Sequence, residues 1–530
     1  MITYIKRNWK PLVLAFLFST IASIVAVRVQ FLKGDVLDYA LTNNRDNTLK
    51  YGLLLGLFII LEIGFYYLYD LSKGRFIVNS IKGVRFDYFT SLLSKAYPEF
   101  LKKKHGEYIA RFTNQMELIE NQYFSIIPLL AEILIKIVTV SIFLFILDFR
   151  LAIVTLILLT TPLYIPKLVE KKLERAQEKF VHQFENHINK VSDWLSGFEV
   201  IKNFSVEHII KEKFKISNNL TMEKNLRKKE MGYLTRTISA FLSYFSHFII
   251  LVFAAYLVLV GDFTAGNFFV AVGMIDQLSY PIISLSYFIQ DLISVRPVNK
   301  SILESIHEKP MTQGSIDIDK RDFSDIELDG ITFSYGEEEP ILNNLNLQFS
   351  DNKRYLLKGP SGSGKTTSMN LLLDYFKPDE GSVKINQVNV SEIKNLNELI
   401  TVMRQDSILF QDTLRHNITM YQDISDERLI ATLRDVGLAN YGSSEKLNGL
   451  VDEKGTNFSG GEKRRITLAR SLLRETPVLI LDEPLANLDE ENAKAIESLI
   501  LKIKDRTVII ISHQFSQENL GKLDGVVDFS

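Results

Sequence analysis

The sequence contains no cysteine and few of the residues that interrupt regular structure. Its 530 residues include 27 glycines and 13 prolines. The absence of cysteine excludes a disulfide, a thiolate nucleophile and a cysteine-held zinc or iron–sulfur site. The low glycine and proline content excludes collagen-like and proline-rich chains, and 46% hydrophobic residues exclude a disordered chain. At roughly 150 residues per domain, the length corresponds to three or four domains or to two large ones.

Charge is divided unevenly along the chain. Residues 1–323 hold 38 Lys and Arg against 30 Asp and Glu, whereas residues 324–530 hold 23 against 33. The basic part also contains the long hydrophobic runs. This combination is typical of a membrane protein with basic cytoplasmic loops, and we do not expect a nucleic-acid partner.

Six stretches approach the roughly 20 apolar residues that a helix needs to cross a bilayer. They are 11–27, 51–69, 123–147, 151–166, 237–261 and 263–290. Buried helices of a soluble protein are the weaker interpretation of so many runs. The first run is not interpreted as a removable signal peptide, because it lacks a small-residue cleavage site and five further runs follow. We therefore expect a helical membrane domain with six transmembrane helices.

Lysine and arginine concentrate in two long connections, 71–122 and 167–236, and are sparse in the alternate ones. Because positive charge is retained on the cytoplasmic side, both long connections and both termini are predicted to be cytoplasmic. These connections are too long for turns, so we expect charged, amphipathic helices that continue the membrane helices.

Several ionisable residues lie inside the apolar runs, where a charge is costly. Glu132 and Lys136 are four residues apart and are expected to pair with each other. Glu62 and Asp276 have no local partner, and they either line a transport pathway or lie in a water-filled cytoplasmic end. His247, among aromatic residues, is interpreted as a packed, neutral histidine.

The character of the chain changes after the last apolar run. Residues from about 294 to 320 are mixed and polar and are interpreted as a linker. The predicted division is a transmembrane domain at 1–300, a linker at 301–323 and a second domain at 324–530. In that domain, strand-like runs at 354–358, 400–403, 478–481 and 507–511 alternate with helical patterns. The alternation predicts an α/β domain built on a mainly parallel sheet.

The strongest motif lies at residues 359–366, which read Gly-Pro-Ser-Gly-Ser-Gly-Lys-Thr and match the P-loop pattern G-x-x-x-x-G-K-[ST]. A strand-like run precedes it and a helix-like run follows, as a phosphate-binding loop requires. Lys365 is expected to reach the outer phosphates, and the Thr366 hydroxyl to hold Mg²⁺. The predicted ATP-binding residues of this segment are Gly359, Pro360, Ser361, Gly362, Ser363, Gly364, Lys365, Thr366 and Thr367.

Two further patterns support a nucleotide site. The strand-like run 478–481 ends in Asp482 and Glu483, which would bind Mg²⁺ and polarise the attacking water, respectively. Gly460 and Gly461 open a helix-like run, so backbone N–H groups and the helix dipole form a second anion site there. One nucleotide has no evident need for two such sites, but a dimer in which each chain covers the other's nucleotide needs both.

These motifs, in this order, resemble the ATP-binding cassette (ABC) transporter family. Residues 458–462 resemble its signature motif, and the resemblance implies that they bind the ATP of the partner chain. It further implies roles for four single residues in the nucleotide site. They are Tyr335 stacking on adenine, Gln405 touching Mg²⁺, Asp489 in the turn that crosses the dimer, and His513 at the γ-phosphate as a catalytic switch beside Glu483 and Lys365.

The resemblance extends over about residues 5–525. Residues 106–112 and 197–204 are similar to the cytoplasmic loops of exporter-type members. Three positions depart from the family pattern: Phe458 replaces a leucine, Glu462 replaces a glutamine, and Ala486 replaces a serine. None of them removes a phosphate or metal ligand, so we expect an active site. Whether both sites of a dimer are equivalent is left open.

The resemblance implies a half-transporter that uses ATP and Mg²⁺ and works with a second half-transporter, identical or related. We expect it in a bacterial plasma membrane with its nucleotide-binding domain in the cytoplasm. The expected function is export of a lipid, a peptide or a small amphipathic compound. Two alternatives stay open: import by the same fold, and a membrane receptor or regulator whose ATPase moves nothing. A soluble ABC protein acting on nucleic acid conflicts with the apolar runs.

Overall fold

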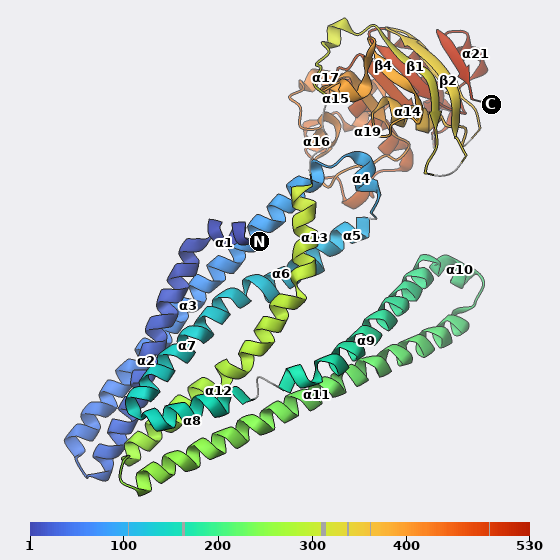
Figure 1. The fold of residues 1–530 in the computed structure, drawn as a ribbon. Helices are drawn as coiled ribbons and strands as arrows, with labels where there is room; N and C mark the ends of the chain where they lie inside the picture. Colours follow the sequence, from blue (N-terminus) through green and yellow to red (C-terminus); the bar gives the residue numbers. More distant parts are fainter. Residues whose placement is uncertain are drawn as a thin grey trace. The chain divides into compact units, whose positions relative to one another are not determined.

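A computed structural model describes residues 1–103, 105–161, 165–308, 314–336, 339–360, 362–486 and 488–529 (Figure 1). Its contacts divide the chain into two compact units. The first contains Met1–Leu93 and Lys104–Glu308, and the second contains Ser94–Lys103 and Lys309–Ser530. Among the described residues, every named strand lies in the second unit.

The first unit is built of helices. They are α1 Ile2–Arg7, α2 Trp9–Leu41, α3 Arg45–Leu93, α5 His105–Ala110, α6 Met116–Ile119, α7 Ile126–Leu147, α8 Phe149–Thr160, α9 Ile165–Ser196, α10 Phe198–Asn203, α11 Glu207–Leu259, α12 Ala265–Ser294 and α13 Arg296–His307. Two π-helical segments, Arg111–Gln115 and Glu120–Phe124, separate α5, α6 and α7. Continuous helix is expected in a bilayer, where each backbone polar group must find its partner within the chain.

Five helices among the described residues are long and apolar enough to cross a membrane. They are Trp9–Leu41, Arg45–Leu93, His105–Leu147, Glu207–Leu259 and Ala265–His307. Each coincides with one of the predicted apolar runs. The fourth predicted run, 151–166, falls mostly on α8, which has only 12 residues, and its positions 162–164 lie outside the described residues. The count of six spans therefore stays a prediction.

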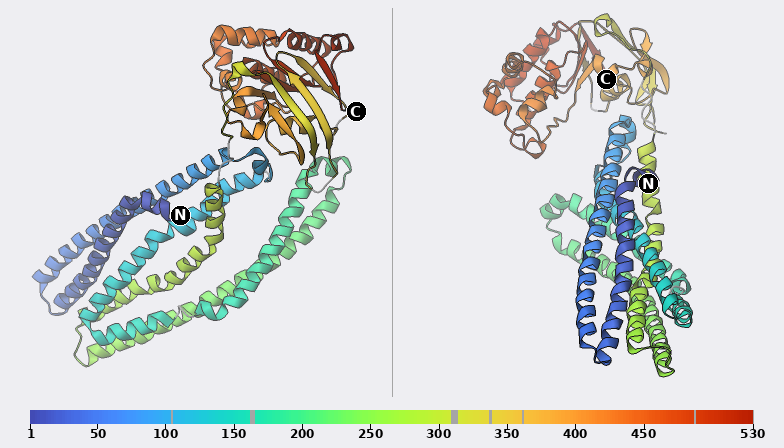
Figure 2. Two further views of the ribbon diagram at one scale, coloured as in Figure 1. Left: turned by 45° about the horizontal axis from the view of Figure 1, so that its top comes forward. Right: turned by 90° about the vertical axis from the view of Figure 1, so that its left-hand side faces the viewer.

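The two basic connections are helical, as predicted. Helix α3 continues its apolar run without a break to Leu93, and α9 and α11 run alongside each other with α10 at their tip (Figures 1 and 2). The segment interpreted as a linker differs from the expectation. Its first half forms α13, whose Ile302 is fully buried in a cluster with Phe76, Val84 and Met116. Packing of this apolar side overrides the polar composition of the segment.

Helices α2 and α12 pack with almost no space between their backbones. A Cβ at Gly266 would lie 2.5 Å from the carbonyl oxygen of Gly34, so only glycine fits. Close to this contact, the carboxylate of Asp38 accepts from the Thr264 hydroxyl at 2.6 Å and from the backbone N–H of Gly266 at 2.7 Å. Asp38 thereby supplies an acceptor to the first turn of α12, whose N–H groups have no partner within the helix.

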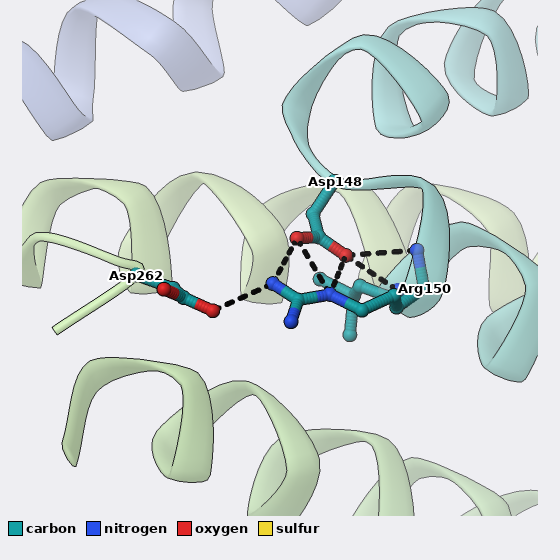
Figure 3. Close-up of polar contacts among 4 residues, drawn as sticks. Asp148, Arg150 and Asp262 are labelled. Atoms are coloured by element: carbon teal, nitrogen blue, oxygen red, sulfur yellow. Dashed lines mark hydrogen bonds and ion pairs between the residues drawn. The ribbon is translucent and has the colours of Figure 1, made fainter. Parts of the chain in front are cut away.

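An ion-pair cluster joins two turns of the first unit (Figure 3). Asp148 caps α8 by accepting from the backbone N–H groups of Arg150 and Leu151. The Arg150 guanidinium lies 2.8 Å from carboxylate oxygens of both Asp148 and Asp262. These contacts connect the α7–α8 turn to the turn between α11 and α12, and the pKa of Asp148 is lowered chiefly by its hydrogen bond with Arg150.

The second unit contains the short helix α4 Tyr97–Leu101 and an α/β domain. Its strands are β1 Asp325–Phe333, β2 Leu342–Ser350, β3 Arg354–Lys358, β4 Glu380–Ile385, β5 Val388–Asn389, β6 Ile400–Met403, β7 Val478–Asp482, β8 Thr507–Ile511 and β9 Gly525–Asp528. Its helices are α14 Lys365–Leu372, α15 Leu396–Leu399, α16 Leu414–Thr419, α17 Asp426–Asp435, α18 Ser444–Leu447, α19 Gly460–Leu473, α20 Glu490–Lys502 and α21 Gln517–Leu520.

These strands form two sheets. The five-stranded sheet has the order β6-β7-β8-β3-β9 with parallel pairing, which confirms the predicted parallel sheet and its four predicted strands. The four-stranded sheet, β2-β1-β4-β5, is antiparallel and was not predicted from the sequence. Strands β7 and β8 are buried at every position, which explains why they read as continuous apolar runs.

We expect Asp38→Ala to destabilise the protein more than Asp262→Ala. Loss of Asp38 leaves a helix N-terminal N–H without its partner, which typically costs about 1 kcal/mol. Asp262 is 46% exposed, and exposed ion pairs contribute about 0–1 kcal/mol. Thermal unfolding of each purified variant measures the order, and an equal or larger loss for Asp262→Ala would contradict the assignment.

Candidate nucleotide-binding site

Three chain segments meet at one edge of the parallel sheet. Strands β7, β8 and β3 are neighbours, and Asp482 at the end of β7 and Leu357 near the end of β3 both pair with Ile511 at the end of β8. Because parallel strands end at the same edge, the loop after β3, the carboxylates after β7 and the residues after β8 are gathered there. The carboxyl edge of such a sheet is where ligands bind in open α/β folds.

The P-loop joins β3 to α14, as its motif predicts. Gly364 is the N-cap of α14 with φ of +93°, and a Cβ there would lie 2.4 Å from the Leu342 side chain. Only glycine can occupy this position. The Lys365 ammonium is buried and donates to the carbonyl oxygens of Gly359 and Pro360 at 2.8 and 2.7 Å. Thr366 is exposed and Thr367 is buried, whereas Ser361 lies outside the described residues.

The two predicted acidic residues occupy different environments. Asp482 ends β7 and is 7% exposed; burial raises its pKa, and the nearby cations of Arg404, Arg464 and Lys365 act in the opposite direction. A cation close to this carboxylate would favour its charged form. Glu483 has a positive φ of 50°, which an ordinary side chain adopts only under constraint, and its N–H donates to the Ile511 carbonyl at 2.8 Å.

Glu483 and His513 lie next to each other. The Nε2 atom of His513 is 3.7 Å from a carboxylate oxygen of Glu483, although the two residues are 30 positions apart. Burial raises the pKa of Glu483, and the neighbouring His513 opposes that shift. A carboxylate with a raised pKa beside a histidine can accept a proton from water more readily than an exposed glutamate. The sequence predicted a role for each residue but not this pairing.

The predicted signature residues form the start of α19. Ser459 is the N-cap and accepts from the backbone N–H of Glu462, whose carboxylate accepts from the N–H of Ser459 at 2.8 Å. This reciprocal arrangement is a capping box. The other carboxylate oxygen of Glu462 accepts from the Tyr441 hydroxyl at 2.8 Å, and the Tyr441 ring packs against Phe458. The two departures from the family motif, Phe458 and Glu462, therefore both contact Tyr441. At Gly460, a Cβ atom would meet nothing within 4 Å, so the space beside this backbone is open.

Arg464 joins the signature helix to the catalytic edge, and sequence reasoning missed it. Its guanidinium donates to the Glu483 carbonyl at 2.6 Å and to the Gln405 carbonyl at 2.8 Å. The residue is 4% exposed, which is unusual for an arginine. One sequence feature could have indicated its burial. Arg464 lies in the signature helix, four residues after Gly460, and the buried apolar residues Ile466 and Leu468 follow it within four positions.

The three remaining single residues occupy separate positions around this edge. The Tyr335 hydroxyl lies 3.3 Å from Oγ1 of Thr367 in the P-loop helix, and Tyr335 meets Phe333 and Phe376 in edge-on contacts. The side chain of Gln405 is exposed, while its backbone is held by Arg464. Asp489 is the N-cap of α20 and accepts from the backbone and side chain of Asn492, which lowers the pKa of Asp489.

A row of side chains leads from α4 toward this edge. The rings of Tyr97 in α4 and Tyr375 have centroids 4.5 Å apart. The Arg404 guanidinium lies 5.6 Å from the Tyr375 centroid and donates to the Asn370 side chain at 2.8 Å. Arg404 directly precedes Gln405, so a displacement of α4 can reach the loop that carries the predicted metal-contacting glutamine.

The polar residues of the membrane unit differ from expectation. No ion pair joins Glu132 and Lys136 in the described part of the chain; the Lys136 ammonium instead lies over the Tyr66 ring, 6.0 Å from its centroid. The predicted pairing is therefore wrong. Asp276 does have a neighbour, since Nε2 of His247 lies 3.7 Å from its carboxylate. That contact crosses from α11 to α12, which sequence separation concealed.

Comparison with protein families agrees with this architecture. Residues 12–282 match the family described as ABC transporter transmembrane region, and residues 342–486 match the family described as ABC transporter. The chain therefore belongs to the ABC transporter family. One transmembrane region fused to one ABC domain makes it a half-transporter, an ATP-binding membrane protein that couples ATP hydrolysis to transport.

Individual relatives cover nearly the whole chain. The "Multidrug resistance-like ATP-binding protein MdlB" of Buchnera aphidicola is 26% identical over 97% of this chain and 90% of its own length. An "ATP-dependent lipid A-core flippase" of Idiomarina loihiensis is 25% identical over the same shares. The "Lactococcin-G-processing and transport ATP-binding protein LagD" of Lactococcus lactis is 24% identical over 94% of this chain and 72% of its own length.

A solved structure shares the fold. It is described as "a bacterial Atm1-family ABC exporter with ATP bound", superposes with a TM-score of 0.82, and is 19% identical in sequence. The superposition covers 99% of this chain and 94% of that chain. The fold of the chain is thus that of an exporter-type ABC protein over both of its units.

We expect Arg464→Met to lower the ATPase rate while ATP binding is largely kept. Each hydrogen bond from a charged group contributes about 1.5–3 kcal/mol, so losing the two that hold Glu483 and Gln405 allows about a tenfold or larger fall. The control is Arg465→Met, because that guanidinium donates to Gly437 and Asn492 instead. Equal activities of the two variants would remove Arg464 from this positioning role.

Proposed function

We propose that the chain exports an amphipathic compound, a lipid or a peptide from the cytoplasm of a bacterium, driven by ATP, as a dimer of half-transporters. The observation that carries the proposal is the joining of an ATPase edge, with Glu483 beside His513, to a helical membrane unit in one chain. The relatives described as multidrug, bacteriocin and lipid A-core transporters support export of hydrophobic or amphipathic cargo.

ATP binds, in this proposal, with its phosphates on the backbone N–H groups of the P-loop and its adenine against Tyr335. Lys365, now hydrogen-bonded to loop carbonyls, turns to the outer phosphates. The oxygen donors of Thr366, Gln405 and Asp482 fit Mg²⁺, which prefers oxygen ligands and shares them with phosphate. Mg²⁺ would neutralise phosphate charge. Glu483 positions the attacking water and takes its proton, and His513 contacts the γ-phosphate.

A second chain completes each nucleotide site. Ser459 and Gly460 begin a 14-residue helix whose N-terminal N–H groups favour an anion. The backbone around Gly460 is uncrowded, so a phosphate can approach it closely. In the proposed dimer, this helix end faces the γ-phosphate bound to the partner's P-loop, and Asp489 lies in the turn that crosses between the chains.

Movement of the nucleotide-binding domains reaches the membrane helices through short helices of the cytoplasmic loops. The row Tyr97, Tyr375 and Arg404 supports such a role for α4. Helix α10, at the tip of the α9–α11 pair, exposes the apolar side chains of Phe198 and Val200. Exposed apolar residues on a charged helical hairpin indicate a docking surface, and we assign α10 to the second coupling contact.

Vesicle transport tests the direction and the existence of transport. In inside-out membrane vesicles, the proposed exporter accumulates a fluorescent amphiphile when ATP is added, whereas an importer would deplete a preloaded one. A receptor or regulator would hydrolyse ATP and move neither. Vesicles carrying Lys365→Ala serve as the control, since this variant keeps the membrane unit and loses phosphate binding.

We expect Glu483→Gln to bind ATP and hydrolyse it very slowly. Glutamine keeps the size of the side chain and loses the charge, while Gly362, Gly364 and Lys365 still bind phosphate. Loss of a positioned base typically lowers a rate by about 10²–10⁴. Phosphate release and ATP retained after rapid gel filtration measure the two properties. Near-normal release would exclude Glu483 as the base, and lost ATP binding would make the residue structural.

We also expect complementation between two inactive variants. In a mixed dimer of Ser459→Arg and Lys365→Ala chains, both lesions fall on one composite site and the other site is intact. Such dimers, enforced by two affinity tags, are predicted to hydrolyse more ATP than either variant alone. ATP binding is measured in parallel, because strict coupling between sites would abolish turnover without abolishing binding. A mixed dimer that neither binds nor hydrolyses ATP argues against shared sites.

A further inference from the structure

Glu497, in helix α20, is a buried carboxylate outside the residues that are expected to contact ATP. It is 3% exposed, and acidic side chains are almost never buried so deeply unless other groups compensate their charge. Lys494 acts on Glu497 electrostatically, but its ammonium forms an ion pair with Glu490 at 2.6 Å. Hydrogen bonds must therefore supply much of the compensation for the buried Glu497 carboxylate.

Three hydrogen bonds reach the Glu497 carboxylate, and all of them come from the segment that follows His513. Its Oε1 atom accepts from the backbone N–H of Ser516 at 2.7 Å. Its Oε2 atom accepts from the Ser516 hydroxyl at 2.6 Å and from the side-chain amide of Asn519 at 2.7 Å. Hydrogen bonds to an ionised acceptor are stronger than those between neutral groups. Glu497 thereby fixes this segment against α20.

His513 lies between two attachments of the chain. Before it, the N–H of Ser512 donates to the Leu357 carbonyl at 3.4 Å, just after the end of β8. After it, Phe515 is buried in a hydrophobic cluster, and Ser516 is bonded to Glu497. Only four residues separate Ser512 from Ser516, so the backbone of His513 has little freedom while both attachments hold. The second attachment is the one that Glu497 supplies.

Helix α20 begins at the turn that is predicted to cross the dimer. Asp489 is its N-cap and accepts from the N–H of Asn492 at 2.9 Å. Glu497 follows Asp489 by eight residues, about two helical turns. A helix holds its length, because each turn is bonded to the next. A displacement of the turn at Asp489 along the helix axis is therefore passed to Glu497 and to the segment bonded to it.

We infer that Glu497 is a positioning residue for ATP hydrolysis, which holds His513 in place and makes its position depend on α20. The inference rests on the role proposed above for His513 at the γ-phosphate, and it adds the group that keeps the histidine there. Glu497 itself contacts neither nucleotide nor metal in this assignment. Closure of the dimer, which sets the turn at Asp489, then also sets His513.

ATP hydrolysis by the full-length protein in nanodiscs tests the assignment. Glu497→Met keeps the length of the side chain and removes both acceptor oxygens. Its kcat is expected to fall about tenfold or more, the effect of losing hydrogen bonds to a charged group. Its KM for ATP is expected to stay within about twofold, because the P-loop is untouched. Glu497→Gln keeps one oxygen for the N–H of Ser516 and is expected to recover most of kcat. The control Glu518→Met, at an exposed position of α21, leaves kcat unchanged.

A double-mutant cycle separates positioning of His513 from a merely structural role. Residual phosphate release is compared between His513→Ala and the double variant His513→Ala, Glu497→Met. If Glu497 acts through His513, the second substitution lowers the rate by less than about twofold in this background, because coupled residues are not additive. Equal fold-changes in the two backgrounds would overturn the inference and make Glu497 a structural residue alone.

The same cycle distinguishes failure of this inference from failure of the proposed function. A slow His513→Ala together with a normal kcat for Glu497→Met would overturn the inference alone. A normal rate for His513→Ala would overturn the role of the histidine, and the inference with it. Ser516→Ala removes only the hydroxyl contact with Glu497 and serves as a milder variant if Glu497→Met does not fold. Its kcat is expected to fall by a smaller factor, and the fall is expected to vanish in the His513→Ala background; an unchanged kcat would contradict the assignment.

Discussion

The parallel pairing of β3, β7 and β8 is the constraint on which the nucleotide site depends. Asp482 and Leu357 pair with Ile511 from opposite sides, so the three strands end level with one another. The P-loop thereby reaches the same edge as Glu483 and His513, although it lies more than 100 residues before them in the sequence. The strands hold this register because β7 and β8 are fully buried, and a slip would remove buried backbone groups from their partners.

Arg464 extends this constraint to the signature helix. A buried guanidinium is stable only when its donors are satisfied, and here two backbone carbonyls accept from it. One carbonyl belongs to Glu483, whose backbone is held at positive φ, and the other belongs to Gln405. Arg404 directly precedes Gln405, donates to Asn370 of α14 and contacts the Tyr375 ring, which in turn contacts Tyr97 of α4. The catalytic edge, the signature helix and α4 therefore share one network of contacts.

The membrane unit follows a different constraint, the satisfaction of backbone groups inside a bilayer. Long continuous helices satisfy this constraint. Glycine then determines how closely two helices approach, and Gly34 of α2 and Gly266 of α12 allow their backbones to come into contact. Polar contacts lie near the turns. There the Asp38 carboxylate accepts a hydrogen bond from the first turn of α12, and Arg150 forms ion pairs with Asp148 and Asp262.

Local patterns in the sequence determined much of this protein. Hydrophobic length identified five membrane helices, continuous apolar runs identified four strands of the parallel sheet, and fixed spacings identified the P-loop and the signature helix, because each of these signals depends on neighbours along the chain. Only the tertiary structure decided the contact of Glu483 with His513, the burial of Arg464, the antiparallel sheet and the pairing of Asp276 with His247. These contacts join residues far apart in the sequence, and side-chain packing, which has no period along the chain, selects them.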